Sequence, residues 1–227
     1  MRFIRRHWYN LGLPLAVLGV LWAARGPLSA VQMILLLNFV VLLLHQFEEY
    51  GWPGGEPWII NEVMTPQGGP PDRYPLNQNN AFFINVVLAY PFYLVPVFFP
   101  NAVWLGLAPV LFGFAQFGMH GIATPRKLKM IYNPGLAAVV LGHFPLGIWY
   151  LIEVYSRSVI TAWSWVFAAA YIAGVIVIGM RRIGYGRLAD KNSAYPFAPD
   201  EMERFDRRGR LARLGNSTAA VASASAA

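Results

Sequence analysis

Residues 31–50, VQMILLLNFVVLLLHQFEEY, decide how this chain folds. The first part, up to Leu44, carries no charged side chain, and His45, Glu48 and Glu49 follow at once. Ionisable side chains at the edge of an apolar segment lose water, so they need partners, a proton or a metal ion. On a helix, His45 lies on the same face as Glu48 at i+3 and Glu49 at i+4. We therefore interpret the rest of the chain as a membrane frame that holds this polar cluster.

The composition is that of an integral membrane protein. Of 227 residues, 56% are hydrophobic and only 13% are charged, against about 25% in a typical soluble domain. Long intervals hold no charged residue, and a bilayer crossing takes about 20 apolar residues. The interval between Arg73 and Arg126 is long enough for two crossings. Intervals long enough for one crossing lie between residues 6 and 25, 25 and 48, 129 and 153, and 157 and 181. A soluble fold is excluded, and the sequence predicts an all-α, polytopic membrane helix bundle.

The intervals predict about six transmembrane helices, over residues 8–24, 28–50, 80–99, 101–120, 136–155 and 160–180. We expect the first helix to be retained, because no small-residue cleavage site follows it. Residues 1–182 then form the transmembrane domain, and residues 183–227 form a basic cytoplasmic tail that is disordered at its end. The longest connection, residues 51–78, is expected to pack at the membrane interface or over the polar cluster. Residues 124–129 are expected to form a basic interfacial loop.

The distribution of lysine and arginine predicts the orientation. Basic residues of the N-terminus, of the 51–78 and 121–134 connections and of the C-terminal tail fall on one side, which leaves only Arg25 and Arg157 on the other. The more basic side of a membrane protein faces the cytoplasm, so both termini of this multi-pass cell-membrane protein are expected there. The net charge of +7 indicates membrane lipid as a partner and no nucleic acid.

The predicted topology brings further histidines to the depth of the cluster. The second and fourth spans end on the cytoplasmic side, and His143 lies about two turns into the fifth span from that side. Imidazole and carboxylate groups are suitable ligands for zinc, iron or manganese. The candidate metal ligands are therefore His45, Glu48, Glu49, His120 and His143. Of the two carboxylates, one is expected to bind the metal and the other to act as a catalytic base or to bridge a second metal.

Three interpretations of the cluster stay open, and the absence of cysteine removes thiolate chemistry from all of them. In the first, a divalent metal activates water, which predicts a metal-dependent membrane hydrolase or oxidoreductase with a lipid-like substrate. In the second, a His–Glu pair relays protons in a transporter or channel. In the third, Glu48 and Glu49 pair with Arg126, Lys127 or Lys129 and only hold helix ends together, as in a non-catalytic scaffold for a protein partner.

Two motifs resemble those of a family of bacterial membrane proteins named for its HXXEE motif. His45-Gln46-Phe47-Glu48-Glu49 matches that motif, and Tyr132-Asn133-Pro134-Gly135 matches a Tyr-x-Pro-Gly motif of the same family. The family also has a further histidine, to which His120 corresponds, with His143 as the weaker match. The resemblance covers about residues 30–155. It implies a membrane location and this choice of residues, and it implies no particular reaction.

Overall fold

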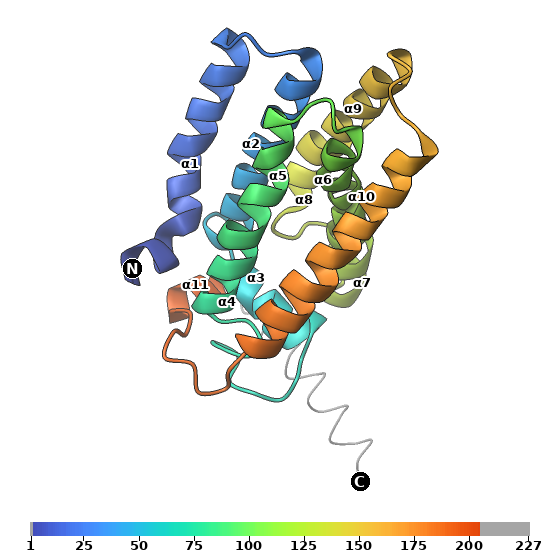
Figure 1. Cartoon of the computed structure of the whole chain (residues 1–227). Helices are drawn as coiled ribbons and strands as arrows, with labels where there is room; N and C mark the ends of the chain where they lie inside the picture. The colour runs from blue at the N-terminus through green and yellow to red at the C-terminus, as the bar shows by residue number, and fades with distance from the viewer. Residues whose placement is uncertain (1, 205–227) are drawn as a thin grey trace.

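A central helix, α2 (Ala30–Tyr50), carries the polar cluster and is surrounded by other long helices (Figure 1). The computed structural model describes residues 2–204, and within that range it contains helices and connections but no strand. α2 packs against α1 (Arg2–Arg25), α5 (Ala89–Phe98) and α9 (Phe144–Ser156). The predicted all-α class is confirmed.

Five helical stretches are long and apolar enough to cross a membrane. They are Ala30–Tyr50, Gln78–Phe98, Val103–Leu128, Leu136–Ser156 and Ala162–Arg187. α1 is a further long helix that packs along α2, although it is not as apolar as these five. Arg6, near the start of α1, lies 3.6 Å from Asp200, near the end of the described chain. The two residues are therefore on the same side of a membrane, and the chain between them must cross it an even number of times. α1 and the five apolar stretches together meet this condition, in agreement with the prediction of about six spans.

Four of the five stretches contain a π-helical segment, which is wider than an α-helix and is frequent at functional sites. The first consists of α4 (Gln78–Phe82), η2 (Phe83–Leu88) and α5. The second consists of α6 (Val103–Gln116), η3 (Phe117–Ala123) and α7 (Thr124–Leu128). The third consists of α8 (Leu136–Ala138), η4 (Val139–His143) and α9, and the last of α10 (Ala162–Gly174) and η5 (Val175–Arg187). Both histidines that could complete the polar cluster lie in such segments, His120 in η3 and His143 in η4.

Two helices extend further than the sequence predicts. The expectation of a loop over residues 124–129 is wrong, because the chain there continues as α7. Pro125 lies inside this continuous helix, directly after the π-helical segment η3, and π-helical turns are among the adjustments by which a helix accommodates a proline. Lys129, with a φ of 53°, ends the helix. The last helix likewise continues past residue 180 to Arg187, since arginine side chains reach water from a helix end.

The 51–78 connection is an ordered structure. It contains α3 (Glu56–Trp58) and the π-helical segment η1 (Ile59–Met64). The buried side chain of Asn61 holds its two halves together, because Nδ2 donates to the Leu76 carbonyl at 2.9 Å and Oδ1 accepts from the Leu76 N–H at 2.8 Å. Buried amide groups need such partners. The connection therefore has a fixed shape.

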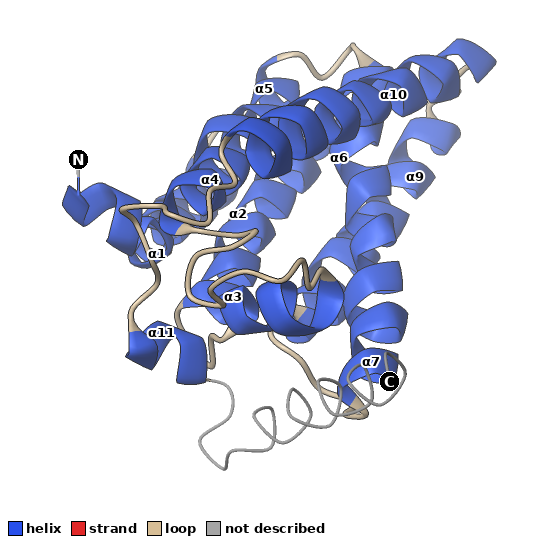
Figure 2. Ribbon diagram, turned by 90° about the horizontal axis from the view of Figure 1, so that it is seen from below, coloured by secondary structure: helices blue, strands red, loops and turns tan. Residues whose placement is uncertain are grey.

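This connection lies across the end of the bundle at which α2 ends (Figure 2). Ile59 packs in one buried cluster with Leu128 of α7. The Lys127 ammonium group donates to the carbonyls of Val63 and Met64, at 3.2 and 3.0 Å. These contacts attach the connection to the end of the fourth span and cover the polar cluster from the outside of the bundle.

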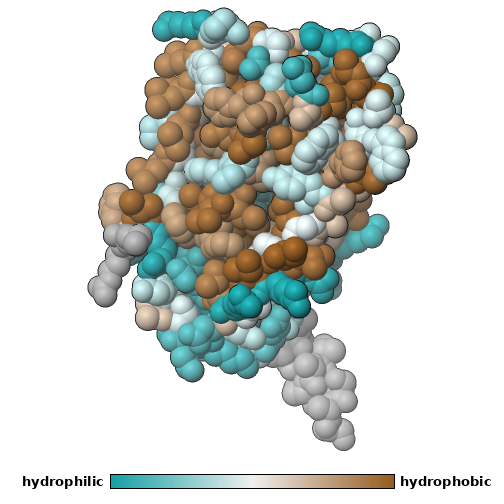
Figure 3. All heavy atoms as spheres, in the orientation of Figure 1, coloured by the Kyte–Doolittle hydropathy of each residue, from teal (hydrophilic) through white to brown (hydrophobic). Residues whose placement is uncertain are grey.

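The C-terminal segment returns to the same end of the bundle. α11 (Pro199–Glu203) lies beside the first turns of α1, where the Tyr9 hydroxyl donates to Glu201 at 3.3 Å. The Arg204 guanidinium donates to the Tyr50 carbonyl, at the end of α2, at 2.8 Å. Figure 3 shows apolar side chains over much of the bundle's face and polar side chains gathered towards both ends. The expected disorder at the end of the tail falls on residues 205–227, which lie outside the described range.

Candidate metal centre

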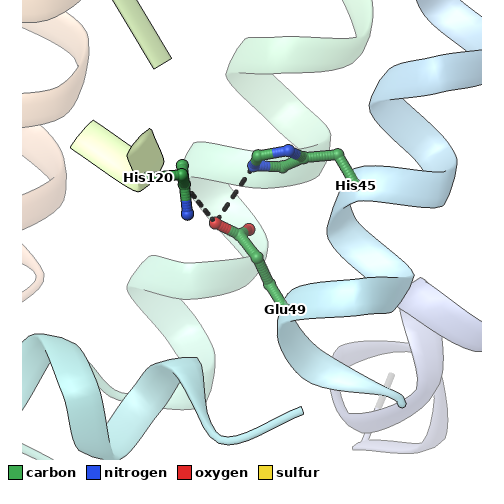
Figure 4. Close-up of side chains that lie close together, drawn as sticks. All are labelled: His45, Glu49 and His120. Atoms are coloured by element: carbon green, nitrogen blue, oxygen red, sulfur yellow. Dashed lines mark ion pairs between the residues drawn. The ribbon is translucent and has the colours of Figure 1, made fainter. Parts of the chain in front are cut away.

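Three buried side chains from two spans meet at the end of α2 (Figure 4). Glu49 Oε1 lies 3.1 Å from His45 Nε2 and 3.4 Å from His120 Nε2. One potential ligand atom of each residue lies within 4.8 Å of the ligand atoms of the other two. His45 and Glu49 meet because they are one helical turn apart on α2, whereas His120 is brought in by η3. The arrangement is a candidate three-ligand metal centre.

The orientation of the His120 ring is fixed by Asn133. The Asn133 amide donates to the His120 carbonyl at 2.6 Å, so its Oδ1 is the atom that faces His120 Nδ1, at 2.8 Å. Since Oδ1 only accepts hydrogen bonds, Nδ1 carries a proton, and Nε2 is the ring nitrogen directed at Glu49. Metal-binding histidines are held in this way by an acceptor on the second ring nitrogen.

The His45 ring contacts Glu49 and has no further hydrogen-bond partner among residues 2–204. Its Nε2 lies within ion-pair distance of Glu49, and its buried Nδ1 has no partner. Two imidazole nitrogens thus face one carboxylate oxygen, and a shared proton or a bound cation can hold the three groups together. Imidazole and carboxylate groups are suitable ligands for a divalent cation, so these three residues fit a metal ion.

Glu48 has a different role from its neighbour Glu49. Its Oε1 accepts from the Tyr132 hydroxyl at 2.8 Å and from the Ala137 N–H at 3.1 Å, and its Oε2 accepts from the Ala138 N–H at 2.9 Å. The carboxylate thus caps the first turn of α8, where a negative charge is favourable. Burial and the nearby Glu48 carboxylate raise the pKa of Tyr132. Glu48 is outside the group of three ligand atoms.

Gly135 explains how the turn before α8 approaches both histidines. Its φ of 94° lies in the left-handed region, which glycine adopts without a steric penalty. A Cβ atom at this position would lie 2.6 Å from His120 Cε1 and 2.9 Å from His45 Cε1. The backbone therefore forms one wall of the centre, and any side chain there would displace the rings.

His143 lies one step deeper in the bundle. Its Nδ1 is 2.7 Å from Asn38 Oδ1, and its ring centroid is 5.7 Å from that of His45. It is fully buried but is not in the group of ligand atoms. Of the two candidate histidines, the structure brings His120 to Glu49 and places His143 behind His45.

The third interpretation, in which Glu48 and Glu49 pair with basic residues and only hold helix ends together, predicts ion pairs that the described part of the chain does not contain. Within residues 2–204, neither Glu48 nor Glu49 forms an ion pair with Arg126, Lys127 or Lys129. Lys127 instead binds backbone carbonyls of η1. The charge of Glu49 is met by histidines alone.

A family model described as a protein of unknown function with HXXEE motif matches residues 36–150 of the chain. This range covers half of the sequence and contains every residue of the centre. The chain belongs to the HXXEE family. No curated protein and no solved structure matches it.

In this member of the family, the HXXEE motif supplies two residues of the centre, His45 and Glu49, and one helix cap, Glu48. The Tyr-x-Pro-Gly motif supplies a hydrogen bond to that cap and the glycine wall.

One residue of this region was not singled out by the sequence. Glu56 is the first residue of α3, is only 6% exposed, and leaves its buried Oε2 without a hydrogen bond. It interacts electrostatically with Glu49 and His120. Burial, together with the Glu49 carboxylate, holds the pKa of Glu56 well above its ordinary value. The signal that could have found it is a lone carboxylate between Gly54-Gly55 and the apolar run of Pro57 and Trp58.

Proposed function

We propose that this HXXEE protein is a metal-dependent membrane enzyme that binds a divalent cation at His45, Glu49 and His120. The observation that carries the proposal is the convergence of two ring nitrogens on one buried carboxylate oxygen, at 3.1 and 3.4 Å. The contact of His120 Nδ1 with Asn133 supports it, because it orients the ring so that Nε2 is the nitrogen available to a cation beside Glu49.

The ligand set supports hydrolysis or oxidation. Three protein ligands leave a position of a four-coordinate metal open to water or substrate, as in catalytic zinc sites. Zinc has no redox chemistry, so a zinc centre would be hydrolytic, whereas iron or manganese would also support oxidation. Glu48 is not proposed as the catalytic base, because its oxygens bind Tyr132 and the α8 backbone.

The position of the centre supports a lipid-like substrate. Its ligands lie in helices that are apolar enough to span a membrane, and the 51–78 connection covers them at the end of the bundle. The outer face of the neighbouring helix is apolar, with Leu141 79% and Ile152 61% exposed. Lipid would surround these side chains, which favours lateral access of the substrate from the bilayer. We propose that the end with the centre faces the cytoplasm, because it is the more basic end.

The test is the metal content of detergent-purified protein by elemental mass spectrometry. We expect about one equivalent of zinc, iron or manganese in the wild type. His45→Ala, Glu49→Gln and His120→Ala should each lose it. His7→Ala is the control, because His7 lies in α1 and bonds only Asn10. A folded wild type that takes up none of the three metals after loading overturns the proposal.

A second measurement tests the enzymatic part. Metal-loaded and metal-stripped protein are incubated with phospholipid vesicles, and new lipid species are followed by mass spectrometry. Turnover that depends on both the metal and Glu49 supports an enzyme. Metal binding without turnover of any bilayer lipid or fatty-acyl ester contradicts the proposed substrate class.

Proton-coupled transport is a second candidate, favoured by one specific observation. Buried polar groups continue inward from His45 through His143 and Asn38 to the unpartnered hydroxyl of Tyr93. Beyond Asn38, however, α2 buries Leu35 and Ile34, so the row of polar groups does not continue along this helix. Proton flux in vesicles that is abolished by His143→Ala, in protein that carries no metal, would favour this alternative.

A further inference from the structure

Glu56 is the buried carboxylate that the metal centre described so far does not use. It enters from the 51–78 connection, so it approaches Glu49 and His120 from the side opposite the bundle interior. Its side chain is more than nine-tenths buried, and Oε2 lies without any hydrogen bond among the described residues. Its electrostatic neighbours are Glu49, which repels it, and His120, which attracts it.

Such a placement is unfavourable for an ionised carboxylate. Buried carboxyl groups are normally protonated, paired, hydrogen-bonded or bound to a metal. No lysine or arginine among residues 2–204 forms an ion pair with Glu56. Two carboxylates that share a buried site repel each other, and a proton on Glu56 removes this repulsion in the metal-free protein. A cation at the neighbouring centre would remove it as well and would let Glu56 ionise.

We propose that Glu56 is the second carboxylate of the metal centre, held beside Glu49 and His120 by the 51–78 connection. The inference rests on the proposed metal binding at His45, Glu49 and His120. Because Glu56 is outside the 4.8 Å group of ligand atoms, it would act on a bound metal through a water molecule, by accepting a hydrogen bond from that water. Glu56 would also be the carboxylate that can take a proton from it.

The charge of the whole set supports a divalent ion. Metal-binding histidines are neutral, so His45 and His120 contribute no charge, while Glu49 and Glu56 contribute one negative charge each. A divalent cation makes this buried set neutral, which is the least unfavourable condition in an apolar environment. Without Glu56 the site would carry an excess positive charge.

The experiment measures zinc affinity of the full-length protein in detergent by competition with a chromophoric chelator. Glu56→Gln keeps the shape of the side chain and removes its charge. We expect zinc to bind about 10–100-fold more weakly, as is typical when an outer-shell partner of a metal site is lost. Glu62→Gln is the matched control, because Glu62 lies two turns along the same connection, is only partly buried and is outside the centre. Its zinc affinity should equal that of the wild type.

A second readout separates a role in metal binding from a role in folding. Metal-free Glu56→Gln should melt at the same temperature as metal-free wild type or higher, because the amide is uncharged beside Glu49 without having to take up a proton. Weaker zinc binding with unchanged or raised metal-free stability is therefore the expected signature, and Glu56→Ala provides a second variant for the same pair of measurements. Equal zinc affinity in wild type, Glu56→Gln and Glu56→Ala overturns this inference while the three-ligand centre stands. A wild type that binds no zinc, iron or manganese overturns both.

Discussion

Replacing Gly135 by alanine should damage the proposed metal centre without replacing any of its ligands. The added Cβ would lie 2.6 Å from His120 Cε1, and ordinary contact begins at 3.4 Å, so the gap must open by about 0.8 Å. Functional groups need to be held within about 0.5 Å of their working geometry. The two histidine rings would move, together or apart, and the zinc affinity should fall.

The stability loss has two parts. An L-residue in the left-handed conformation, which a φ of 94° imposes, costs about 1–2 kcal/mol. Forcing an extra methyl group into a well-packed site adds about 1–3 kcal/mol. Gly135→Ala should therefore lower the free energy of unfolding by about 2–5 kcal/mol, most of it present even in metal-free protein, because the clash is with the rings themselves.

The assay is thermal unfolding of detergent-solubilised protein, with and without zinc, together with zinc affinity by chelator competition. Gly118→Ala is the control: Gly118 lies two residues before His120, and a Cβ there meets nothing within 4 Å. Alanine is a better helix former than glycine, so this variant should be as stable as the wild type or more stable. If Gly135→Ala melts and binds zinc like Gly118→Ala, the proposed wall beside the two rings is refuted.

Three further predictions follow from the hydrogen bonds around the centre. Glu48→Gln should lower the free energy of unfolding by about 1.5–3 kcal/mol, the usual value for hydrogen bonds to a charged group. The variant should still hold about one metal equivalent by elemental analysis. Loss of the metal at full stability would show that Glu48 is a ligand. Asn133→Ala frees the His120 ring and should weaken zinc binding about 10–100-fold in the same chelator competition, and unchanged affinity would speak against this orientation. Arg204→Ala removes the bond to the Tyr50 carbonyl and should speed amide exchange in the 51–78 connection, seen by mass spectrometry; unaltered exchange would mean that the C-terminal segment does not hold that connection.

The membrane architecture could be predicted because it depends on local properties. A bilayer accepts only long charge-free segments whose backbone hydrogen bonds are satisfied internally, and such segments are visible in the sequence. The pairing of His45 with Glu49 was equally accessible, since i+4 residues meet on any helix. The ends of the spans were less accessible. The fourth span continues past His120 into α7, because the π-helical segment η3 lets the helix accommodate Pro125, and nothing in the local sequence announces such a segment.

The sequence by itself thus determined an all-helical membrane protein and a site built on one turn of α2. Only the tertiary structure decided which residues share that site. Glu48 and Glu49 look equivalent in the motif, but consecutive residues of a helix point about 100° apart, so one faces α8 and the other faces His120. The choice of His120 over His143, and the return of Glu56 towards Glu49 from the connection that follows α2, depend on how separate segments pack. Such contacts carry no local signal, because they are set by the packing of the whole bundle.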